Sequence, residues 1–289
     1  MRSKCPSLLV FALGLSLLAN AGCGPLRPGT DSRENDPVPA SPASADAYNE
    51  ALPYGNPSNA TTDPNNPDNY LVVHDSHVLS YNDSRGTMNW VAWRTTLEDL
   101  GERLPRELFQ PDRSLPAGFR RIQYYDYSGS GYDRGHMVPS ADRFANPKLN
   151  EQTFLMTNIV PQTGDLNQFP WNKLESYGRT LARRGNTIYT ISGVYGEKER
   201  LRGKVTVPTN CWKVIVVLRR GNIEISGPTR IIAVDMPNVD GIENVPWERY
   251  KTTVRSIEQK TGLDLFSSLP RELQDVIETR VDPNTLYSP

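Results

Sequence analysis

The residues best suited to chemistry stand together in one stretch, residues 128–143, with the sequence SGSGYDRGHMVPSADR. Its histidine, His136, can accept or donate a proton near neutral pH without a large shift of its pKa. Three glycines in the stretch permit sharp backbone turns and close approach of a ligand. Asp133, Arg134 and Arg143 surround the imidazole with charge, and arginine is well suited to binding phosphate. A proton acceptor beside phosphate-binding cations predicts hydrolysis of a phosphodiester.

The tetrapeptide DRGH at residues 133–136 resembles the signature of the DNA/RNA non-specific endonucleases, the ββα-metal nucleases that include endonuclease G. The similarity extends to further blocks in the family's order and spacing, and it is greatest to the cyanobacterial sugar-non-specific nucleases. These blocks are NWVAW at residues 89–93, PDRSLP at 111–116, TNIVPQ at 157–162, LN at 166–167, Trp171, and LE at 174–175. The resemblance covers about residues 66–285, and several blocks in one order are far more specific than four letters.

Attack of water on an anionic phosphodiester needs a base, a counter-charge and a positioned water, and His136 is the candidate base. The absence of a second histidine or a cysteine pair beside it argues against zinc, whereas Mg²⁺ prefers oxygen ligands and keeps several waters. The resemblance implies that Asn167 is the direct protein ligand of Mg²⁺, with Mn²⁺ as a substitute. Considered alone, Asn167 before Pro170 is more typical of a helix N-cap. We expect Asp133 to have a structural role, accepting hydrogen bonds from loop amides.

Glu175 and Arg179 are spaced i, i+4, which by itself is typical of a surface ion pair worth about 0.3–0.5 kcal/mol. The resemblance implies instead that Glu175 orients a metal-bound water and that Arg179 supports the phosphate. A helix continuous from Asn167 would separate it from Glu175 by about 12 Å along the axis. We therefore expect the helix to begin after Asn167.

The resemblance implies roles for three more residues. Arg106 is the best match to the arginine that stabilises the transition state, with Arg103 and Arg113 as alternatives. Arg134 is expected to contact phosphate or to fasten the signature loop. Asn158 is expected to position His136 or the backbone near it.

The net charge of −1 conceals a segregation of charge along the chain. Between residues 31 and 75 there are eight acids and one base, whereas between residues 179 and 220 there are ten Lys/Arg residues and two acids. A local basic surface binds phosphates whatever the total charge, although a solvated helix face also explains the pattern. With 37% hydrophobic and 22% charged residues, a packed core is feasible and wholesale disorder is excluded.

The first 23 residues predict an export signal. Two basic residues precede a short apolar run, and AGC at residues 21–23 resembles a lipoprotein cleavage site with Cys23 as the lipidated residue. Ordinary secretory cleavage is the alternative, giving a periplasmic or secreted protein. Residues 24–65 are rich in Pro, Ala, Ser and Asn, which predicts a disordered tether.

Residues 66–289 predict a single endonuclease domain of α+β class. The implied fold is the ββα-metal (His-Me finger) nuclease fold, with a central, largely antiparallel sheet flanked by helices. Periodicity and turn residues predict strands over residues 70–73, 78–81, 88–94, 153–157, 187–192, 204–207, 211–219, 222–225 and 229–234. They predict helices over residues 168–184, 246–260 and 269–280. Trp90 and Trp93 are expected in the core, although aromatic residues can also stack on bases.

These features predict an exported, Mg²⁺-dependent endonuclease that cuts single- and double-stranded DNA and RNA. The resemblance implies 5′-phosphate ends, and contacts with phosphates explain low sequence specificity because phosphates carry no sequence information. The alternative is a surface nucleic-acid-binding protein without catalysis, against which His136, Asn167 and Glu175 argue. A hydrolase of another type is disfavoured because G-x-S-x-G, H-E-x-x-H and P-loop motifs are absent from the sequence.

Overall fold

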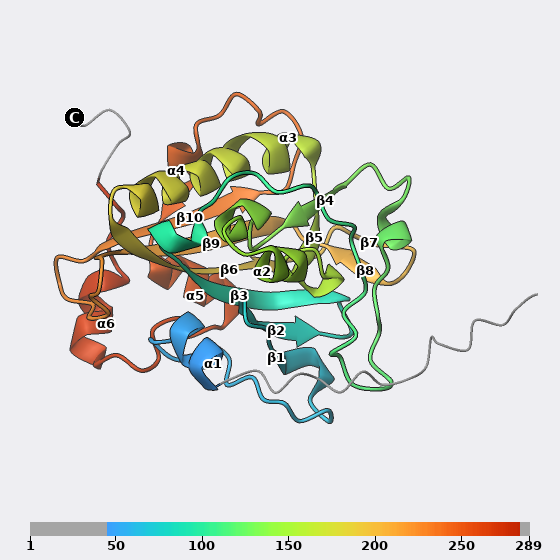
Figure 1. Cartoon of the computed structure of the whole chain (residues 1–289), viewed down its shortest axis with the longest axis horizontal. Coiled ribbons are helices and arrows are strands. Elements are labelled where there is room, and N and C mark those ends of the chain that lie inside the picture. The colour runs from blue at the N-terminus through green and yellow to red at the C-terminus, as the bar shows by residue number, and fades with distance from the viewer. Residues whose placement is uncertain (1–44, 284–289) are drawn as a thin grey trace, which may run out of the picture. The chain divides into compact units, whose positions relative to one another are not determined.

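A seven-stranded antiparallel sheet organises the part of the chain that the computed structural model describes, residues 45–283 (Figure 1). Its strand order is β1-β2-β3-β6-β9-β10-β11. The strands are β1 (Tyr70–Val73), β2 (Val78–Asn82), β3 (Thr87–Thr95), β6 (Asn186–Tyr195), β9 (Asn210–Arg219), β10 (Arg230–Pro237) and β11 (Lys251–Thr252). Two small antiparallel ladders, β4 (Asp133–His136) with β5 (Ile159–Gln162) and β7 (Glu199–Leu201) with β8 (Val205–Val207), lie at one end of it (Figure 1).

Alternation along the strands divides the hydrophobic core between the two faces of the sheet. In β3, Val91 and Trp93 join one core cluster, whereas Trp90 and Ala92 join the other. Successive side chains of a strand point to opposite faces, so a strand buried on both sides contributes to two cores. Trp90 and Trp93 are therefore core residues, as predicted.

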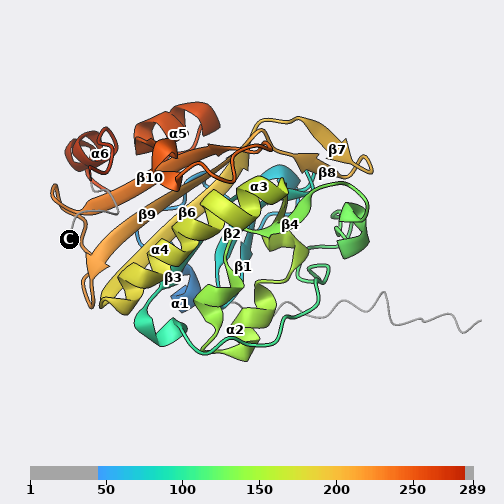
Figure 2. The ribbon, with the colours of Figure 1, turned by 90° about the horizontal axis from the view of Figure 1, so that it is seen from above.

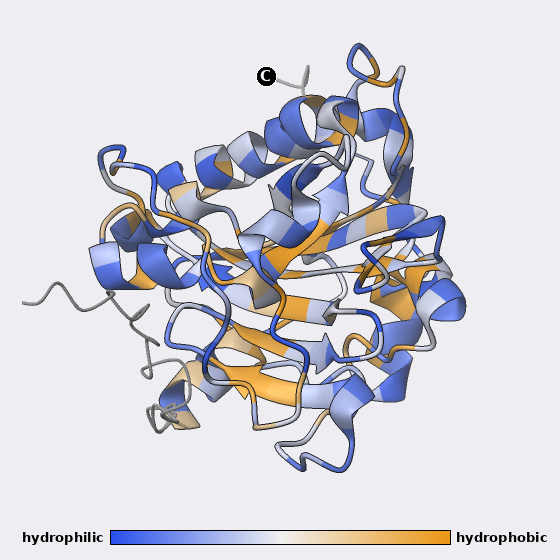
Figure 3. Ribbon diagram, turned by 90° about the vertical axis from the view of Figure 1, so that its right-hand side faces the viewer, coloured by the Kyte–Doolittle hydropathy of each residue, from blue (hydrophilic) through white to orange (hydrophobic). Residues whose placement is uncertain are grey.

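The helices cover these two faces separately, as Figure 2 shows from above. Helix α4 (Asn172–Arg183) packs Leu174, Leu181 and Ala182 on the first face. The second face is covered by α1 (Ala45–Ala51), α5 (Val254–Thr261) and α6 (Arg271–Ile277). Two further short helices, α2 (Pro147–Gln152) and α3 (Gly164–Leu166), flank β5 in the chain. Apolar residues concentrate in the strands, while the helices and loops carry many polar residues (Figure 3).

The α+β class and the largely antiparallel sheet are confirmed, and residues 45–283 fall within one compact unit. Six predicted strands, those at residues 70–73, 78–81, 88–94, 187–192, 211–219 and 229–234, overlap β1, β2, β3, β6, β9 and β10. The prediction at 204–207 corresponds to β8. Among the described residues, no helix is both long and apolar enough to span a membrane.

The predicted tether is wrong for residues 45–65. Ala51, Leu52, Tyr54 and Ala60 are buried in the second core cluster. The apolar residues are few, but they suffice to anchor the segment because they pack against buried residues of the sheet. The folded domain therefore begins before residue 66. The export signal, Cys23 and the start of the tether lie outside the described residues.

Two predicted strands are absent from the described structure because local side-chain hydrogen bonds favour other conformations. Residues 153–157 are largely buried, but Thr153 Oγ1 donates to Asn150 O and the segment turns before β5 begins. Residues 222–225 form a loop in which the Glu224 backbone N–H donates to Asn222 Oδ1.

The predicted helix at residues 246–260 is divided. Lys251 and Thr252 form β11 and pair with β10, because extending the sheet satisfies their backbone groups. Thr253 then caps α5 by accepting a hydrogen bond from the Ser256 backbone N–H. The last predicted helix, at 269–280, corresponds to the shorter α6.

Candidate active site

His136 ends β4 and is held between β5 and the helical stretch that follows β5. Gly135 is required by close packing, since a Cβ there would lie 1.9 Å from Gln162 Oε1. On the helix side, Trp171 Nε1 donates to the backbone oxygen of His136 at 3.4 Å. Two strands and a helix thus form the ββα unit that the resemblance implies.

The imidazole of His136 is packed between aromatic rings. Its centroid lies 4.8 Å from that of Phe154 and 5.3 Å from that of Phe109. The buried Nε2 atom has no hydrogen-bond partner among the described residues. Burial, assisted by the positive charge of Arg106, lowers the pKa of His136 to about 3. The ring is therefore neutral near pH 7, and a neutral imidazole has one nitrogen free to accept a proton.

The helical stretch runs without a break from α3 through a π turn (Asn167–Trp171) into α4. Thr163 caps its start by accepting a hydrogen bond from the Leu166 backbone N–H. The expectation that the helix begins after Asn167 is therefore wrong, and Asn167 is not an N-cap. Pro170 has no backbone N–H to donate. It fits inside the helix because the π turn already interrupts the regular i→i−4 hydrogen bonds there.

The π turn decides which side chains share a face of the helix. A turn closed by i→i+5 bonds brings Asn167 and Asn172 to the same side, and α-helical spacing adds Glu175 and Arg179. All four line a hollow of about 300 Å³ together with His136. The structure thus brings together four residues that the sequence predicted for the site: His136, Asn167, Glu175 and Arg179. Asn172 was missed because no motif marks it.

The carboxylate of Asp133 orients the side chain of Asn167. Asn167 Nδ2 and Gln168 Nε2 both lie 2.9 Å from Asp133 Oδ2. Since an ionised carboxylate only accepts hydrogen bonds, the amide nitrogen of Asn167 must face it, and Oδ1 is then the atom of this amide that could bind a cation. Asp133 therefore has a positioning role, but through side-chain amides rather than the expected loop amides.

Glu175 forms an ion pair with Lys213 of β9, not with Arg179. Lys213 Nζ lies 3.2 Å from Glu175 Oε1 and 4.2 Å from the centroid of the Trp171 ring. The lysine side chain is 1% exposed. Burial raises the pKa of Glu175 and lowers that of Lys213, and the attraction between the two charges opposes both shifts. The surface ion pair that i, i+4 spacing suggested is absent.

Arg179 is fixed by Asp142, which the sequence did not assign. Arg179 Nη1 donates to Asp142 Oδ1 at 3.0 Å. The other carboxylate oxygen accepts hydrogen bonds from Trp93 Nε1 and Thr95 Oγ1, at 3.0 and 3.2 Å. A guanidinium that lines the hollow is therefore held by a buried and fully bonded carboxylate.

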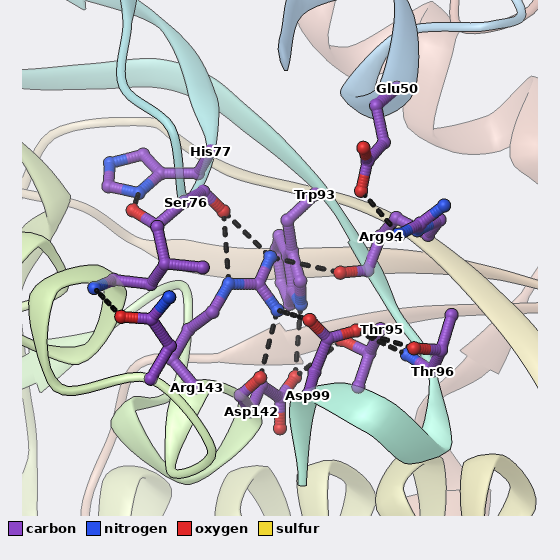
Figure 4. Close-up of polar contacts among 12 residues, drawn as sticks. Glu50, Ser76, His77, Trp93, Arg94, Thr95, Thr96, Asp99, Asp142 and Arg143 are labelled. Atoms are coloured by element: carbon purple, nitrogen blue, oxygen red, sulfur yellow. Dashed lines mark hydrogen bonds and ion pairs between the residues drawn. The ribbon is translucent and has the colours of Figure 1, made fainter. Parts of the chain in front are cut away.

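Arg143 does not surround the imidazole as expected. Figure 4 shows its guanidinium enclosed by backbone and carboxylate groups from several segments. Arg143 Nη2 donates to the backbone oxygens of Ser76 and Arg94, at 2.7 and 2.9 Å, and Nη1 lies 4.0 Å from Asp99 Oδ1. These contacts join β3 to the segment after β4, so Arg143 stabilises the fold.

A second hollow of about 290 Å³ lies next to the first and shares Asn167 with it. Arg106 and Arg134 line this hollow. Neither Arg103 nor Arg113 lines either hollow. Of the three candidate arginines, Arg106 is the one whose positive charge lowers the pKa of His136.

Arg134 has two kinds of contact. Its Nε and Nη2 atoms donate to the backbone oxygen of Tyr124, at 2.9 and 2.7 Å, which fastens the preceding loop. Its guanidinium also lies 5.8 Å from the centroid of the Phe109 ring. Arg134 therefore fastens the loop and still lines the second hollow.

Asn158 holds the backbone after His136 rather than the imidazole. Its Oδ1 accepts from the Val138 backbone N–H at 2.9 Å, and its Nδ2 donates to the backbone oxygens of Val138 and Thr153. The side chain is fully buried with three hydrogen bonds, which makes it a rigid support for the end of β4.

Comparisons with known proteins agree with this geometry. The family model for DNA/RNA non-specific endonuclease matches residues 55–272. A protein named Nuclease, from Nostoc sp., is 46% identical over 232 residues, which is 79% of this chain and 84% of that protein. Human mitochondrial endonuclease G is 34% identical over 209 residues, or 67% of this chain and 68% of that protein. A chain in the crystal structure of the EndoG/EndoGI complex superposes with a TM-score of 0.65 at 26% identity, covering 78% of this chain and 94% of that one.

Proposed function

The chain belongs to the DNA/RNA non-specific endonuclease family, and on that premise we propose that it hydrolyses phosphodiester bonds of single- and double-stranded DNA and RNA with Mg²⁺ as cofactor. The observation that carries the proposal is the first hollow. A neutral imidazole, an amide oxygen, a carboxylate and a guanidinium line it together. These are the base, metal ligands and counter-charge that phosphodiester hydrolysis needs.

The residues present fit a hard divalent cation. Asn167 offers an oriented amide oxygen, and Glu175 offers a carboxylate in the same hollow. Oxygen ligands and room for several waters suit Mg²⁺, and Mn²⁺ is an expected substitute. Asn167 would hold the metal directly and Glu175 through a water. The ion would neutralise charge that develops on the phosphate oxygens.

His136 acts as general base in this proposal. Water attacks the phosphorus while its proton passes to the neutral imidazole, and the P–O3′ bond breaks. The leaving 3′ oxygen takes a proton from water, so the products are a 5′-phosphate and a 3′-hydroxyl. Asn158 keeps the backbone after His136 rigid while the proton moves.

The arginines supply the counter-charge. Arg106 and Arg134 line the second hollow, and Arg179 lines the first. Guanidinium groups bind phosphate oxygens in a bidentate manner and remain charged, so they favour a transition state with added negative charge. We assign transition-state stabilisation to Arg106, and phosphate binding to Arg134 and Arg179.

Digestion of plasmid DNA and of RNA with Mg²⁺ and with EDTA tests the function directly. We expect cleavage of both substrates with Mg²⁺, none with EDTA, and 5′-phosphate ends. Asn167→Ala should lose metal-dependent cleavage while the circular dichroism spectrum stays native. Gln168→Ala is the matched control, because it removes the neighbouring amide on Asp133 without removing the metal ligand. Normal Mg²⁺ dependence in Asn167→Ala would contradict the assignment.

We also propose that the protein is exported and anchored by a lipid at Cys23. The support is the basic start, the short apolar run and the small residues before Cys23. Mass spectrometry of the mature N-terminus should find a diacylglyceryl cysteine at Cys23. An unmodified N-terminus downstream would contradict the lipid anchor and leave the nuclease function untouched.

A further inference from the structure

Two tyrosines project into solvent beside the second hollow. Tyr124 and Tyr125 are 52% and 48% exposed, and their ring centroids lie 5.5 Å apart. Both belong to a 3₁₀ turn (Tyr124–Tyr127) that lies in the chain just before β4. Large aromatic side chains bury much apolar area when a ligand covers them. An exposed pair therefore indicates a surface that binds a ligand or partner.

The turn that carries these rings is rigid. Tyr127 is buried and its hydroxyl donates to the backbone oxygen of Ile159 at 3.1 Å. Asp126 is also buried, and accepts hydrogen bonds from the Gln123 backbone N–H at 2.9 Å and from Lys204 Nζ at 3.0 Å. Inward anchoring of two residues fixes the other two facing outward. The backbone of the turn is therefore preorganised, which limits the entropy that the protein loses when a partner stacks on the rings.

The exposed pair is continuous with the phosphate-binding side of the active site. Arg134, which lines the second hollow, donates twice to the backbone oxygen of Tyr124. Its guanidinium carbon lies 6.0 Å from the centroid of the Tyr124 ring. The same guanidinium carbon lies 5.8 Å from the centroid of the Phe109 ring, which packs on His136. The guanidinium of Arg134 thus lies near one ring of each aromatic pair, Phe109 beside His136 and Tyr124 beside Tyr125.

We propose that Tyr124 and Tyr125 form a subsite that stacks unpaired bases of the strand whose phosphates occupy the hollow of Arg106 and Arg134. This inference rests on the proposed nuclease function and extends it. A charged groove that binds phosphates, bordered by aromatic rings that accept any base, is the general arrangement for sequence-tolerant binding of single strands. In a duplex the bases are stacked inside and cannot reach the rings. The subsite therefore favours single-stranded DNA and RNA over duplexes.

The test compares Tyr124→Ala/Tyr125→Ala with the native enzyme on a short single-stranded oligonucleotide and on the same sequence as a duplex. We expect KM for the single strand to rise by about 5- to 150-fold, the range for loss of one stacked base, with kcat and duplex cleavage nearly unchanged. Tyr124→Phe/Tyr125→Phe should restore the native KM because it keeps both rings. Ile223→Ala is the matched control, since Ile223 is 61% exposed and lies outside both hollows.

A substrate with abasic nucleotides identifies the stacked groups. Removing bases but not phosphates beside the cut site should raise KM for the native enzyme and leave KM of the double alanine variant unchanged. Equal losses on single strand and duplex, or no loss on either, would overturn the subsite. If the native enzyme cleaves none of these substrates with Mg²⁺, the nuclease function itself fails. If the native enzyme cleaves them and the tyrosine variants match it, the subsite alone fails.

Discussion

A cluster of charged side chains lies on each face of the sheet, and the two clusters differ in how their carboxylates are neutralised. Beneath the first hollow, Glu175 lies 3.2 Å from Lys213, and Asp142 lies 3.0 Å from Arg179. Each carboxylate has its own cation. A buried carboxylate with a dedicated counter-charge and hydrogen bonds can stay ionised in a fixed orientation, as a metal-binding or phosphate-binding site requires.

On the opposite face, three carboxylates come together: Glu258 of α5, the exposed Asp264 that follows α5, and the buried Glu278 that follows α6. Oxygens of Glu258, Asp264 and Glu278 lie within 4.8 Å of one another. Arg255 serves two of them, 2.8 Å from Glu278 and 3.9 Å from Glu258. Burial, together with the negative charge of Glu278, raises the pKa of Glu258 to about 7. Burial raises the pKa of Glu175 and of Glu258, but among the described residues Glu175 is paired with Lys213 alone, whereas Glu258 shares Arg255 with Glu278.

The largest effect is expected for substitution of His136, and it distinguishes the active site from the second cluster. His136→Ala should lower single-turnover cleavage by about 10²- to 10⁴-fold, because a positioned base is lost. DNA affinity in EDTA should change little, since it comes mainly from Lys/Arg contacts with phosphate. Glu278→Gln, on the opposite face, should keep native turnover. A folded His136→Ala variant that cleaves at the native rate would refute the general base.

Breaking the pairing beneath the hollow should be the next largest effect. Lys213→Met leaves the Glu175 carboxylate buried without its cation, which should lower the free energy of unfolding by about 3–5 kcal/mol. Lys213→Met/Glu175→Gln should recover much of that stability but none of the activity. Urea unfolding measures the stability of each variant, and Mg²⁺-dependent cleavage of plasmid DNA measures its activity.

A control shows whether burial causes that loss. Arg220→Met breaks an exposed pair with Glu98 and should leave the unfolding midpoint nearly unchanged. If the double variant at Lys213 and Glu175 were no more stable than Lys213→Met, an uncompensated charge would not be the cause.

The second cluster should make stability depend on pH. The folded-state pKa of Glu258, about 7, is above the ordinary value of 4.5. The folded protein therefore favours the protonated form, and this contribution is complete below pH 4.5 and lost as the pH rises through 7. With solvent screening it amounts to about 1–2 kcal/mol. Thermal melts between pH 5 and 8 should show the decline, and Glu258→Gln should flatten it. An unchanged slope in Glu258→Gln would show that another group titrates.

The smallest effect is expected for Asp275, an exposed residue that borders the second cluster. Asp275 also pairs with Arg255 at 2.8 Å, but its side chain is 58% exposed. Asp275→Asn should change the free energy of unfolding by less than about 0.5 kcal/mol, because water replaces an exposed partner. Urea unfolding at pH 7 measures it. A loss as large as that expected for Lys213→Met would mean that exposure does not distinguish these ion pairs.

Local sequence patterns determined much of this protein. Alternation identified the main strands, and the order of short blocks identified the family and the residues that line the hollow, among them His136, Asn167 and Glu175. Alternation could also have identified Lys213 as an inward-facing residue. It lies two residues from Cys211 and from Ile215, so its side chain is on the same side of β9 as theirs, which face the first core. A charged residue at an inward position indicates a buried partner, although its identity does not follow from spacing.

Tertiary structure alone decided which side chains neutralise and orient one another. Asp133 orients Asn167 from 34 residues away, and Lys213 neutralises Glu175 from 38 residues away. The π turn that turns Asn167 toward Glu175 also depends on packing, because no propensity rule predicts an i→i+5 turn at Pro170. Periodicity reports only how a residue relates to its own element. Contacts between elements arise when the hydrophobic faces pack, and that packing sets the charge, orientation and proton affinity of the active site.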